Sequence, residues 1–148
     1  MTSLIDPGTF SRDQEFSGAK GLVLVGTQTI VYRRSADAPR AQNLLDLPGG
    51  GREGNESPFE TFAREVKEEF GLSIKPADIV YSRRYQGQQN PKFFGYHMVA
   101  QLPASAQNDI IYGNEGVSYT LMTIDEYLSR ADAWQEYQAR TRDYMDTV

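Results

Sequence analysis

The sequence predicts a single α/β (α+β) domain built on a mixed β-sheet. Apolar runs of strand length lie on both sides of one strongly amphipathic helical segment, and further helical patterns follow near the C-terminus. This arrangement is typical of layered α/β or α+β architectures. The chain has 148 residues, the usual length of one domain. We expect residues 1–17 to form an irregular lead-in and residues 18–148 to form the domain.

Six apolar segments are expected to form the strands of the sheet. The first two flank the turn residues Gly26, Thr27 and Gln28, and so predict a β-hairpin. The third ends at Pro48 and the glycines that follow it, which favour a turn. The expected strands lie within residues 21–35, which hold two of them, and at residues 44–47, 79–85, 93–102 and 116–122.

Residues 57–70 form the strongest helical pattern in the chain. Ser57 is a favourable N-cap, Pro58 suits the first helical position, and Glu60 completes a capping box. Such a cap stabilises a helix by about 1 kcal/mol. Gly71 is expected to end the helix, because helices commonly end at a glycine in the left-handed conformation. The predicted apolar face consists of Phe59, Phe62, Ala63, Val66 and Phe70.

Two further helices are expected near the C-terminus. Thr123 and Glu126 match a second capping box, which predicts a short helix over residues 125–130. Residues 134–145 predict an amphipathic helix with its aromatic side chains on or near one side. Trp134 is expected to anchor this helix on the rest of the domain.

The composition restricts the kind of site that the chain can form. It contains no cysteine and one histidine, His97, which excludes disulfides, thiolate metal sites and histidine-rich zinc sites. Any metal must therefore be held by oxygen ligands, which suit magnesium, manganese or calcium. The formal net charge of −5 disfavours broad binding to a nucleic-acid polymer. A small anionic substrate is still compatible with this charge if a metal neutralises it locally.

The chain also lacks the patterns of a membrane protein. No apolar run approaches the roughly 20 residues that span a bilayer. The N-terminus is polar and is interrupted by Pro7 and Gly8, so it does not resemble a signal peptide. We therefore expect a cytoplasmic location and no membrane partner.

Glu65, Glu68 and Glu69 have the i, i+3 and i+4 spacing of residues that share one side of a helix, opposite the apolar face. Two carboxylates roughly 6 Å apart repel by about 3 kcal/mol at an effective dielectric near 20. The cluster becomes favourable when a divalent cation binds between its members. Taken alone, the helix also fits a solvated acidic face with pairs such as Arg64–Glu68.

The spacing of the whole segment 50–72 distinguishes these interpretations. It reads glycine, five residues, glutamate, seven residues, Arg-Glu-aliphatic, one residue, Glu-Glu, one residue, Gly-aliphatic. This pattern resembles the Nudix box of the Nudix hydrolase family, the MutT-type pyrophosphohydrolases, with no departure at any fixed position. The flanks are similar too, so the resemblance covers roughly residues 18–130. The fixed positions are Gly50, Glu56, Arg64, Glu65, Val66, Glu68, Glu69, Gly71 and Leu72.

The resemblance implies an α/β/α sandwich around a mixed sheet. It also implies hydrolysis of a phosphoanhydride bond in a nucleoside diphosphate linked to a group X. By the same resemblance, Mg²⁺ or Mn²⁺ is bound by Glu65, Glu68 and Glu69, and the backbone carbonyl of Gly49 is a further candidate ligand. Glu56 and Arg64 are expected to form a structural ion pair that ties the loop to the helix. Gly50 and Gly71 complete the motif.

The sequence offers two candidates for the general base, Glu68 and Glu115. The competing interpretation of Glu115 is a solvated glutamate in a loop. Arg34 and Arg84 are candidates for contact with substrate phosphates, and Tyr85 for stacking on a base. A surface charge or core packing is the competing interpretation of each. Other residues considered for the same roles are Arg33, Arg83, Lys92, Phe93, Phe94 and Tyr119.

The sequence leaves the substrate open. Subgroup markers for ADP-ribose and dinucleoside polyphosphate enzymes do not fit, because Gln88 occupies the position 16 residues past Leu72, and Tyr85 and Pro91 are offset from it by three. We expect a nucleoside triphosphate or similar small nucleotide, in a housecleaning role. The alternatives are an ADP-ribose or nucleotide-sugar pyrophosphatase, and a non-catalytic nucleotide-binding regulator with the same fold.

Overall fold

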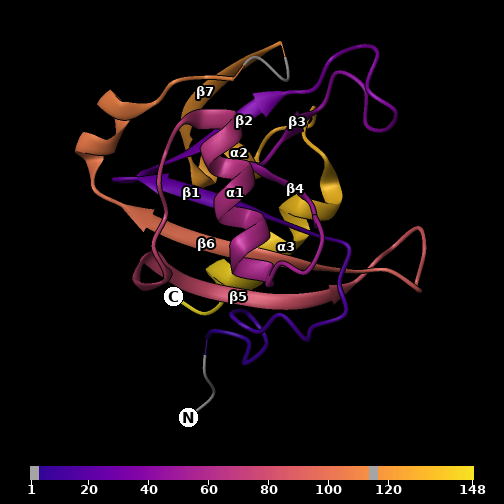
Figure 1. The fold of residues 1–148 in the computed structure, drawn as a ribbon. Coiled ribbons are helices and arrows are strands. Elements are labelled where there is room, and N and C mark those ends of the chain that lie inside the picture. Colours follow the sequence, from indigo (N-terminus) through magenta and orange to yellow (C-terminus); the bar gives the residue numbers. More distant parts are fainter. Residues whose placement is uncertain (1–3, 114–116) are drawn as a thin grey trace.

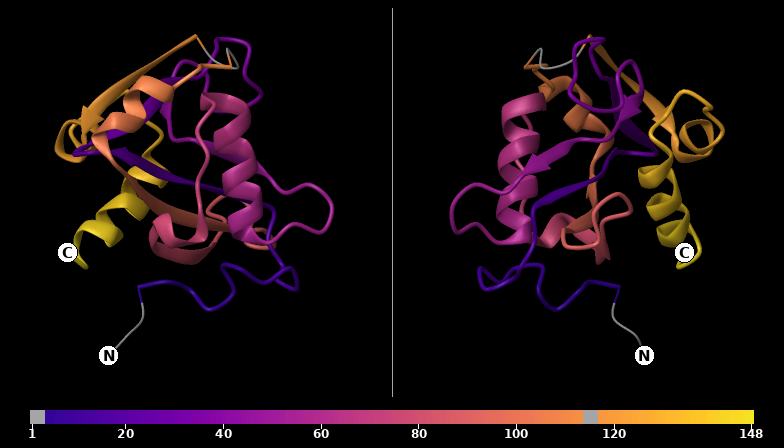
Figure 2. Two further views of the ribbon diagram at one scale, coloured as in Figure 1. Left: turned by 60° about the vertical axis from the view of Figure 1, so that its left-hand side comes forward. Right: turned by 90° about the vertical axis from the view of Figure 1, so that its right-hand side faces the viewer.

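The computed structural model describes residues 4–113 and 117–148. A mixed β-sheet lies between the helix α1 on one face and the helices α2 and α3 on the other (Figures 1 and 2). This three-layer arrangement confirms the predicted α/β class with a mixed sheet. No helix among the described residues has the length and apolar character needed to cross a membrane.

The described strands form one seven-stranded sheet with a central path β3-β2-β1-β6-β5. β1 and β6 are parallel, with Gly18 opposite Gly95 and Val25 opposite Leu102, and the other pairs are antiparallel. β4 pairs with β1, and β7 pairs with β2. The strands are β1 Gly18–Val25, β2 Gln28–Arg33, β3 Leu45–Asp46, β4 Gly49–Gly51, β5 Ile79–Gln86, β6 Phe94–Leu102 and β7 Ser118–Thr123.

The predicted strands are present, with shifted bounds and one addition. The expected first residue of the last strand, Gly116, lies outside the described residues. The addition is β4, which occupies the glycines that the sequence predicted as a turn. It forms because Gly49, Gly50 and Gly51 pair with Lys20, Ala19 and Gly18 of β1. A long-range partner therefore overrides the local preference of glycine for turns.

Helix α1, Pro58–Phe70, begins and ends as predicted. Its N-cap Ser57 and Glu60 form both hydrogen bonds of the capping box, and Gly71 follows with φ of 70°. Helix α2, Ile124–Leu128, begins immediately after its N-cap Thr123, one residue earlier than expected. The last helix, α3, spans Gln135–Met145. Two short 3₁₀ turns, η1 Pro76–Asp78 and η2 Ala104–Asp109, complete the regular elements of the described chain.

Two apolar cores, one on each face of the sheet, hold the layers together. Phe62, Val66 and Phe70 of α1 are fully buried against the first face. Tyr127 of α2 and Tyr144 of α3 pack against the second. Because burial of one large apolar side chain contributes about 1.5–3 kcal/mol, these residues fix the positions of the helices.

The prediction that the three glutamates of α1 share one side away from the core was wrong. Glu69 is only 3% exposed, and its Oε1 accepts a hydrogen bond of 3.0 Å from the amide of Gly49. The side chain of Glu68 is 48% exposed, and that of Glu65 is 15% exposed. The difference arises because β4 packs along α1 and covers Glu69.

Candidate active site

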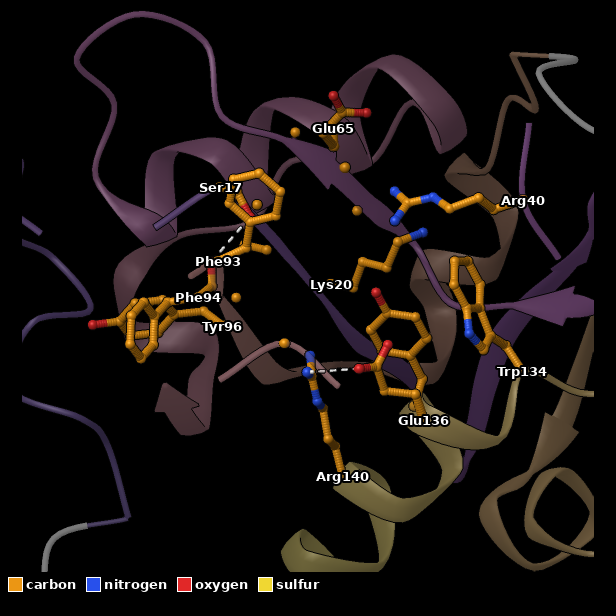
Figure 3. Close-up of a pocket in the computed structure, with 18 of the residues that line it drawn as sticks. Ser17, Lys20, Arg40, Glu65, Phe93, Phe94, Tyr96, Trp134, Glu136 and Arg140 are labelled. Carbon is orange, nitrogen blue, oxygen red and sulfur yellow. Dashed lines mark hydrogen bonds and ion pairs between the residues drawn. The ribbon is translucent and has the colours of Figure 1, made fainter. Parts of the chain in front are cut away.

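A cleft of about 580 Å³ opens beside β4 and α1, between the sheet and the start of α3 (Figure 3). This volume lies within the range of about 300–1,000 Å³ that small-molecule sites occupy. Glu65, Glu69 and the glycines of β4 line one wall, which we call the acidic wall. Arg34, Arg40 and Lys20 line another, which we call the cationic wall.

The acidic wall brings carboxylates and backbone into direct contact. The Gly49 amide donates to Glu69, and Gly50 lies against the Glu65 carboxylate. A Cβ atom at Gly50 would lie 2.6 Å from Glu65 Cδ and 2.8 Å from each carboxylate oxygen. A side chain at this position would therefore displace the carboxylate of Glu65.

Arg64 joins the loop after β4 to α1. Its Nε donates to Glu56 Oε2 at 2.7 Å, and its Nη2 donates to the carbonyl of Gly51 at 2.8 Å. Its Nη1 bridges Glu65 Oε1 at 3.0 Å and Glu68 Oε2 at 3.2 Å. The hydrogen bond to Glu56 is the largest cause that raises the pKa of Arg64. Burial alone would raise the pKa of Glu56, but its hydrogen bonds, chiefly that from Arg64, hold the pKa below its usual value.

The donors of the acidic wall suit a cation that prefers oxygen ligands. Glu65 and Glu69 offer carboxylate oxygens at the cleft, and the missing side chain at Gly50 leaves their approach open. Such a set fits Mg²⁺ or Mn²⁺, which also take waters and substrate phosphates as ligands. Within residues 4–113 and 117–148, no three Asp, Glu or His side chains are grouped closely enough to hold a metal ion by themselves. Glu68 does not line the cleft, since it is turned toward Arg64 and solvent.

The cationic wall is organised around the fully buried carboxylate of Asp46. Its Oδ2 accepts from Lys20 Nζ at 2.5 Å, from Arg34 Nη1 at 2.9 Å and from the hydroxyl of Tyr32 at 3.1 Å. Burial would lower the pKa of Lys20, but the charge of Asp46 raises it above the usual value. Lys20 is therefore charged at neutral pH. The guanidinium of Arg34 also lies over the ring of Trp134, 5.2 Å from its centroid.

Of Arg34, Arg84 and Tyr85, only Arg34 lies at the cleft, and Phe93 and Phe94, which were considered for the same roles, line it too. Arg84 donates to the carbonyl of Glu15 at 3.0 Å, and its guanidinium covers the ring of Phe94. The hydroxyl of Tyr85 donates to Asp143 on α3 at 2.8 Å. As neighbours on β5, Arg84 and Tyr85 point to opposite faces of the sheet and each holds another segment in place. We therefore withdraw both as substrate contacts.

Gly49 lines the cleft, and Gly71 ends α1. Glu115, the second candidate for the general base, lies outside the described residues.

Four charged residues of the cleft were not predicted from the sequence, namely Lys20, Arg40, Glu136 and Arg140. Lys20 could have been found, because it is the only charged residue in the otherwise apolar β1. Arg40 carries no such signal, since it stands in a polar loop among other exposed residues. Trp134 lines the cleft as well as preceding α3, so its role extends beyond the anchor that the sequence predicts.

Comparisons with known proteins agree with this architecture. A family model described as the NUDIX domain matches residues 17–144. Among solved structures, a MutT protein from Methanosarcina mazei Go1 is similar, with a TM-score of 0.66, 21% identity and coverage of 89% of this chain and 96% of that chain. An Ap4A hydrolase from C. elegans has a TM-score of 0.65, 16% identity and coverage of 88% of this chain and 96% of that chain.

A bifunctional NMN adenylyltransferase/ADP ribose pyrophosphatase from Francisella tularensis, complexed with AMP and a Mn ion, is also similar. Its TM-score is 0.68 at 13% identity, over 90% of this chain and 42% of that chain. A comparison with curated proteins finds no match. At these identities the solved structures establish the fold. The family model spans most of the chain and confirms the resemblance that segment 50–72 predicts. The chain belongs to the Nudix hydrolase family.

Proposed function

We propose that this protein hydrolyses a phosphoanhydride bond in a nucleoside diphosphate linked to a group X, with Mg²⁺ or Mn²⁺ as cofactor. The expected substrate is a nucleoside triphosphate or a similar small nucleotide. The observation that carries the proposal is the acidic wall, where Glu65 and Glu69 of the complete Nudix box meet the backbone of β4 at a cleft of nucleotide size. The Mn ion in the F. tularensis structure supports the choice of cofactor.

Each residue of the acidic wall has a proposed task. Glu65, Glu69 and the carbonyl of Gly49 hold the cation. Glu68, which lies next to this wall, is the third of the carboxylates that the Nudix box implies as metal ligands. When bound, the cation neutralises the charge of a diphosphate and lowers the pKa of water. Arg64 keeps Glu65 and Glu68 in place through Nη1, while its other nitrogens fix the loop.

The proton of the attacking water needs a carboxylate acceptor. Of the two candidates, only Glu68 lies among the described residues. Its side chain is half-exposed and is held beside Glu65 by Arg64. Glu115 stays the alternative.

The substitution Glu68→Gln tests the proposal, because it keeps the shape of the side chain and removes its charge. We expect hydrolysis with Mg²⁺ to fall by about 10²–10⁴-fold, the usual contribution of an acid–base group. The fold should persist, since the side chain is 48% exposed. Glu15→Gln is the matched control, because this exposed glutamate lies before β1 and does not line the cleft. Unchanged activity in Glu68→Gln would refute the assigned role.

A substrate panel decides between the proposed function and its alternatives. It should contain nucleoside triphosphates, oxidised dGTP, ADP-ribose, nucleotide sugars and dinucleoside polyphosphates, each with Mg²⁺ and with Mn²⁺. The products show which phosphoanhydride bond is cleaved. Tight binding of a nucleotide without turnover under either metal would favour the non-catalytic regulator.

A further inference from the structure

The cationic wall of the cleft carries more positive charge than its own carboxylate neutralises. Lys20 and Arg34 share the single charge of Asp46, and Arg40 adds a third cation. Arg140 and Glu136, which also line the cleft, form an ion pair at 3.3 Å and leave this excess unchanged. The wall therefore has three positive charges against one negative charge.

Arg40 is the residue of this wall that is most open to a ligand. Its backbone carbonyl accepts a hydrogen bond of 3.0 Å from Nε of Arg34, the residue that follows β2. Within the described chain, its guanidinium forms no ion pair with a carboxylate. In Figure 3 the ends of Arg40 and Lys20 both point into the cleft and toward one another. Two like charges in this arrangement repel, so an anion between them is favoured.

Lys20 is held in place by more than its ion pair. Its Nζ lies 5.8 Å from the ring centroid of Trp134 and 5.5 Å from that of Tyr137. Cation–π contacts of this kind fix a flexible lysine without neutralising its charge. The positive charge is therefore positioned before any ligand arrives, which lowers the entropy lost on binding.

We propose that Arg40 and Lys20 bind the terminal phosphate of a nucleoside triphosphate. Arg34, which shares Asp46 with Lys20, adds to the positive charge at this site. This inference rests on the proposed function, in which the acidic wall and its cation engage the scissile bond. A terminal phosphate carries about −1.5 to −2 charge at pH 7, close to the excess on the wall. The two phosphates of ADP-ribose or a nucleotide sugar are both internal, so each carries a single negative charge. The wall thus selects nucleoside triphosphates over diphosphate-linked sugars.

The rest of the cleft fits this orientation of the substrate. Phe93 lies at a separate part of the rim from Arg40, and its side chain extends into the cleft (Figure 3). It is 57% exposed, which leaves a face of the ring open for stacking. Gln88, Gln89 and Asn90 from the same loop also line the cleft and supply amides for the edge of a base. The base end and the phosphate end of the cleft are therefore chemically distinct.

Binding of inorganic tripolyphosphate in the presence of EDTA tests the anion site without any metal or turnover. We expect Arg40→Gln to weaken the affinity by about tenfold or more, as expected for a lost charge-assisted contact. Lys92→Gln is the matched control, because it also removes one positive charge. Lys92 stands in the loop beside Phe93 and does not line the cleft. Isothermal titration calorimetry measures both. No binding by the wild type, or equal affinities in the two variants, would overturn the proposal.

Steady-state kinetics with Mg²⁺ separate this inference from the proposed function. We expect a nucleoside triphosphate to be the preferred substrate, and Arg40→Gln to raise its KM by about tenfold with a smaller change in kcat. A wild-type preference for ADP-ribose or a nucleotide sugar would overturn the phosphate site and leave the hydrolase function standing. Binding of tripolyphosphate without turnover of any nucleotide would support the phosphate site and overturn the hydrolase function.

Discussion

Gly50 shows how a single residue determines the shape of the acidic wall. Its Cα faces Glu65 so closely that an added methyl group would lie 2.6–2.8 Å from three atoms of that side chain. Gly51 is next in the same strand, yet the nearest atom to a Cβ there is 3.9 Å away. The two neighbours therefore form a matched pair, because an alanine would alter the carboxylate at one position and meet open space at the other.

Gly50→Ala is expected to weaken Mn²⁺ binding by about tenfold or more, because a displaced carboxylate ligand loses its geometry. Gly51→Ala should bind Mn²⁺ as the wild type does. Titration of Mn²⁺, followed by calorimetry or by the signal of free Mn²⁺ in electron paramagnetic resonance, compares the three proteins without substrate. Equal Mn²⁺ affinities of Gly50→Ala and the wild type would show that Glu65 does not hold the ion.

At the scale of elements, α1 is positioned by a charged link as well as by its apolar face. Glu56 lies in the loop before the helix and accepts from Arg64 within it, while Arg64 also donates to the Gly51 carbonyl at the end of β4. Thr61 donates a further hydrogen bond of 3.0 Å to Glu56. This link fixes β4, its following loop and α1 relative to one another, and so positions Glu65 and Glu69.

The link predicts a loss of stability in acid. The pKa of Glu56 is lower in the folded protein than its ordinary value of 4.5, so the folded state binds fewer protons than the unfolded state. Its contribution to stability is therefore present above pH 4.5 and is lost as the pH falls through the folded pKa. We expect the free energy of unfolding in urea to fall less steeply below pH 4.5 in Glu56→Gln than in the wild type.

Glu15→Gln serves as the control for this comparison, because this exposed glutamate takes no part in the link between Glu56 and Arg64. Parallel curves for Glu56→Gln and the wild type would contradict the prediction.

At the scale of the whole molecule, the irregular segment before β1 joins several elements. The amide of Asp6 donates to the Ser82 carbonyl of β5, and its carboxylate accepts from the hydroxyl of Tyr96 on β6. The carbonyl of Thr9 accepts from the amide of Phe59 at the start of α1. The segment therefore acts as a strap across the sheet and the helix.

Removal of residues 1–14 is expected to lower the free energy of unfolding by more than about 2 kcal/mol. Each buried hydrogen-bond partner that is left unpaired costs about 1–3 kcal/mol, and several are lost together. Thermal and urea unfolding measure the effect. Removal of the exposed residues 147–148 is the control and should change stability little. A truncated protein as stable as the wild type would show that the strap only rests on the surface.

Much of the fold could be predicted from the sequence because its signals are local. The capping box of Ser57 and Glu60, the apolar stripe of α1 and the terminating Gly71 all lie within a few residues of one another. The strands were recognisable as apolar runs for the same reason. β4 was not, since glycines form a strand there only because β1 offers them a partner.

The site was predictable to a smaller extent. The spacing of segment 50–72 identified the family, and the contact between Glu56 and Arg64 is within reach of sequence reasoning because both belong to that segment. The burial of Glu69 depends on β4 and was missed. Arg84 and Tyr85 lie away from the cleft because Arg84 contacts the strap and Tyr85 contacts α3. No local sequence pattern predicts these contacts with β5.

The Nudix box could be recognised without any structure, because its fixed positions lie on one loop and one helix, and the family model agrees with it. The charges that meet at the cleft could not be recognised in this way. Lys20 stands on β1, Asp46 on β3, and Arg34 directly follows β2, so they come together through the pairing of β1, β2 and β3. Such contacts follow from strand order and register, which are fixed by the packing of the whole chain and not by neighbouring residues.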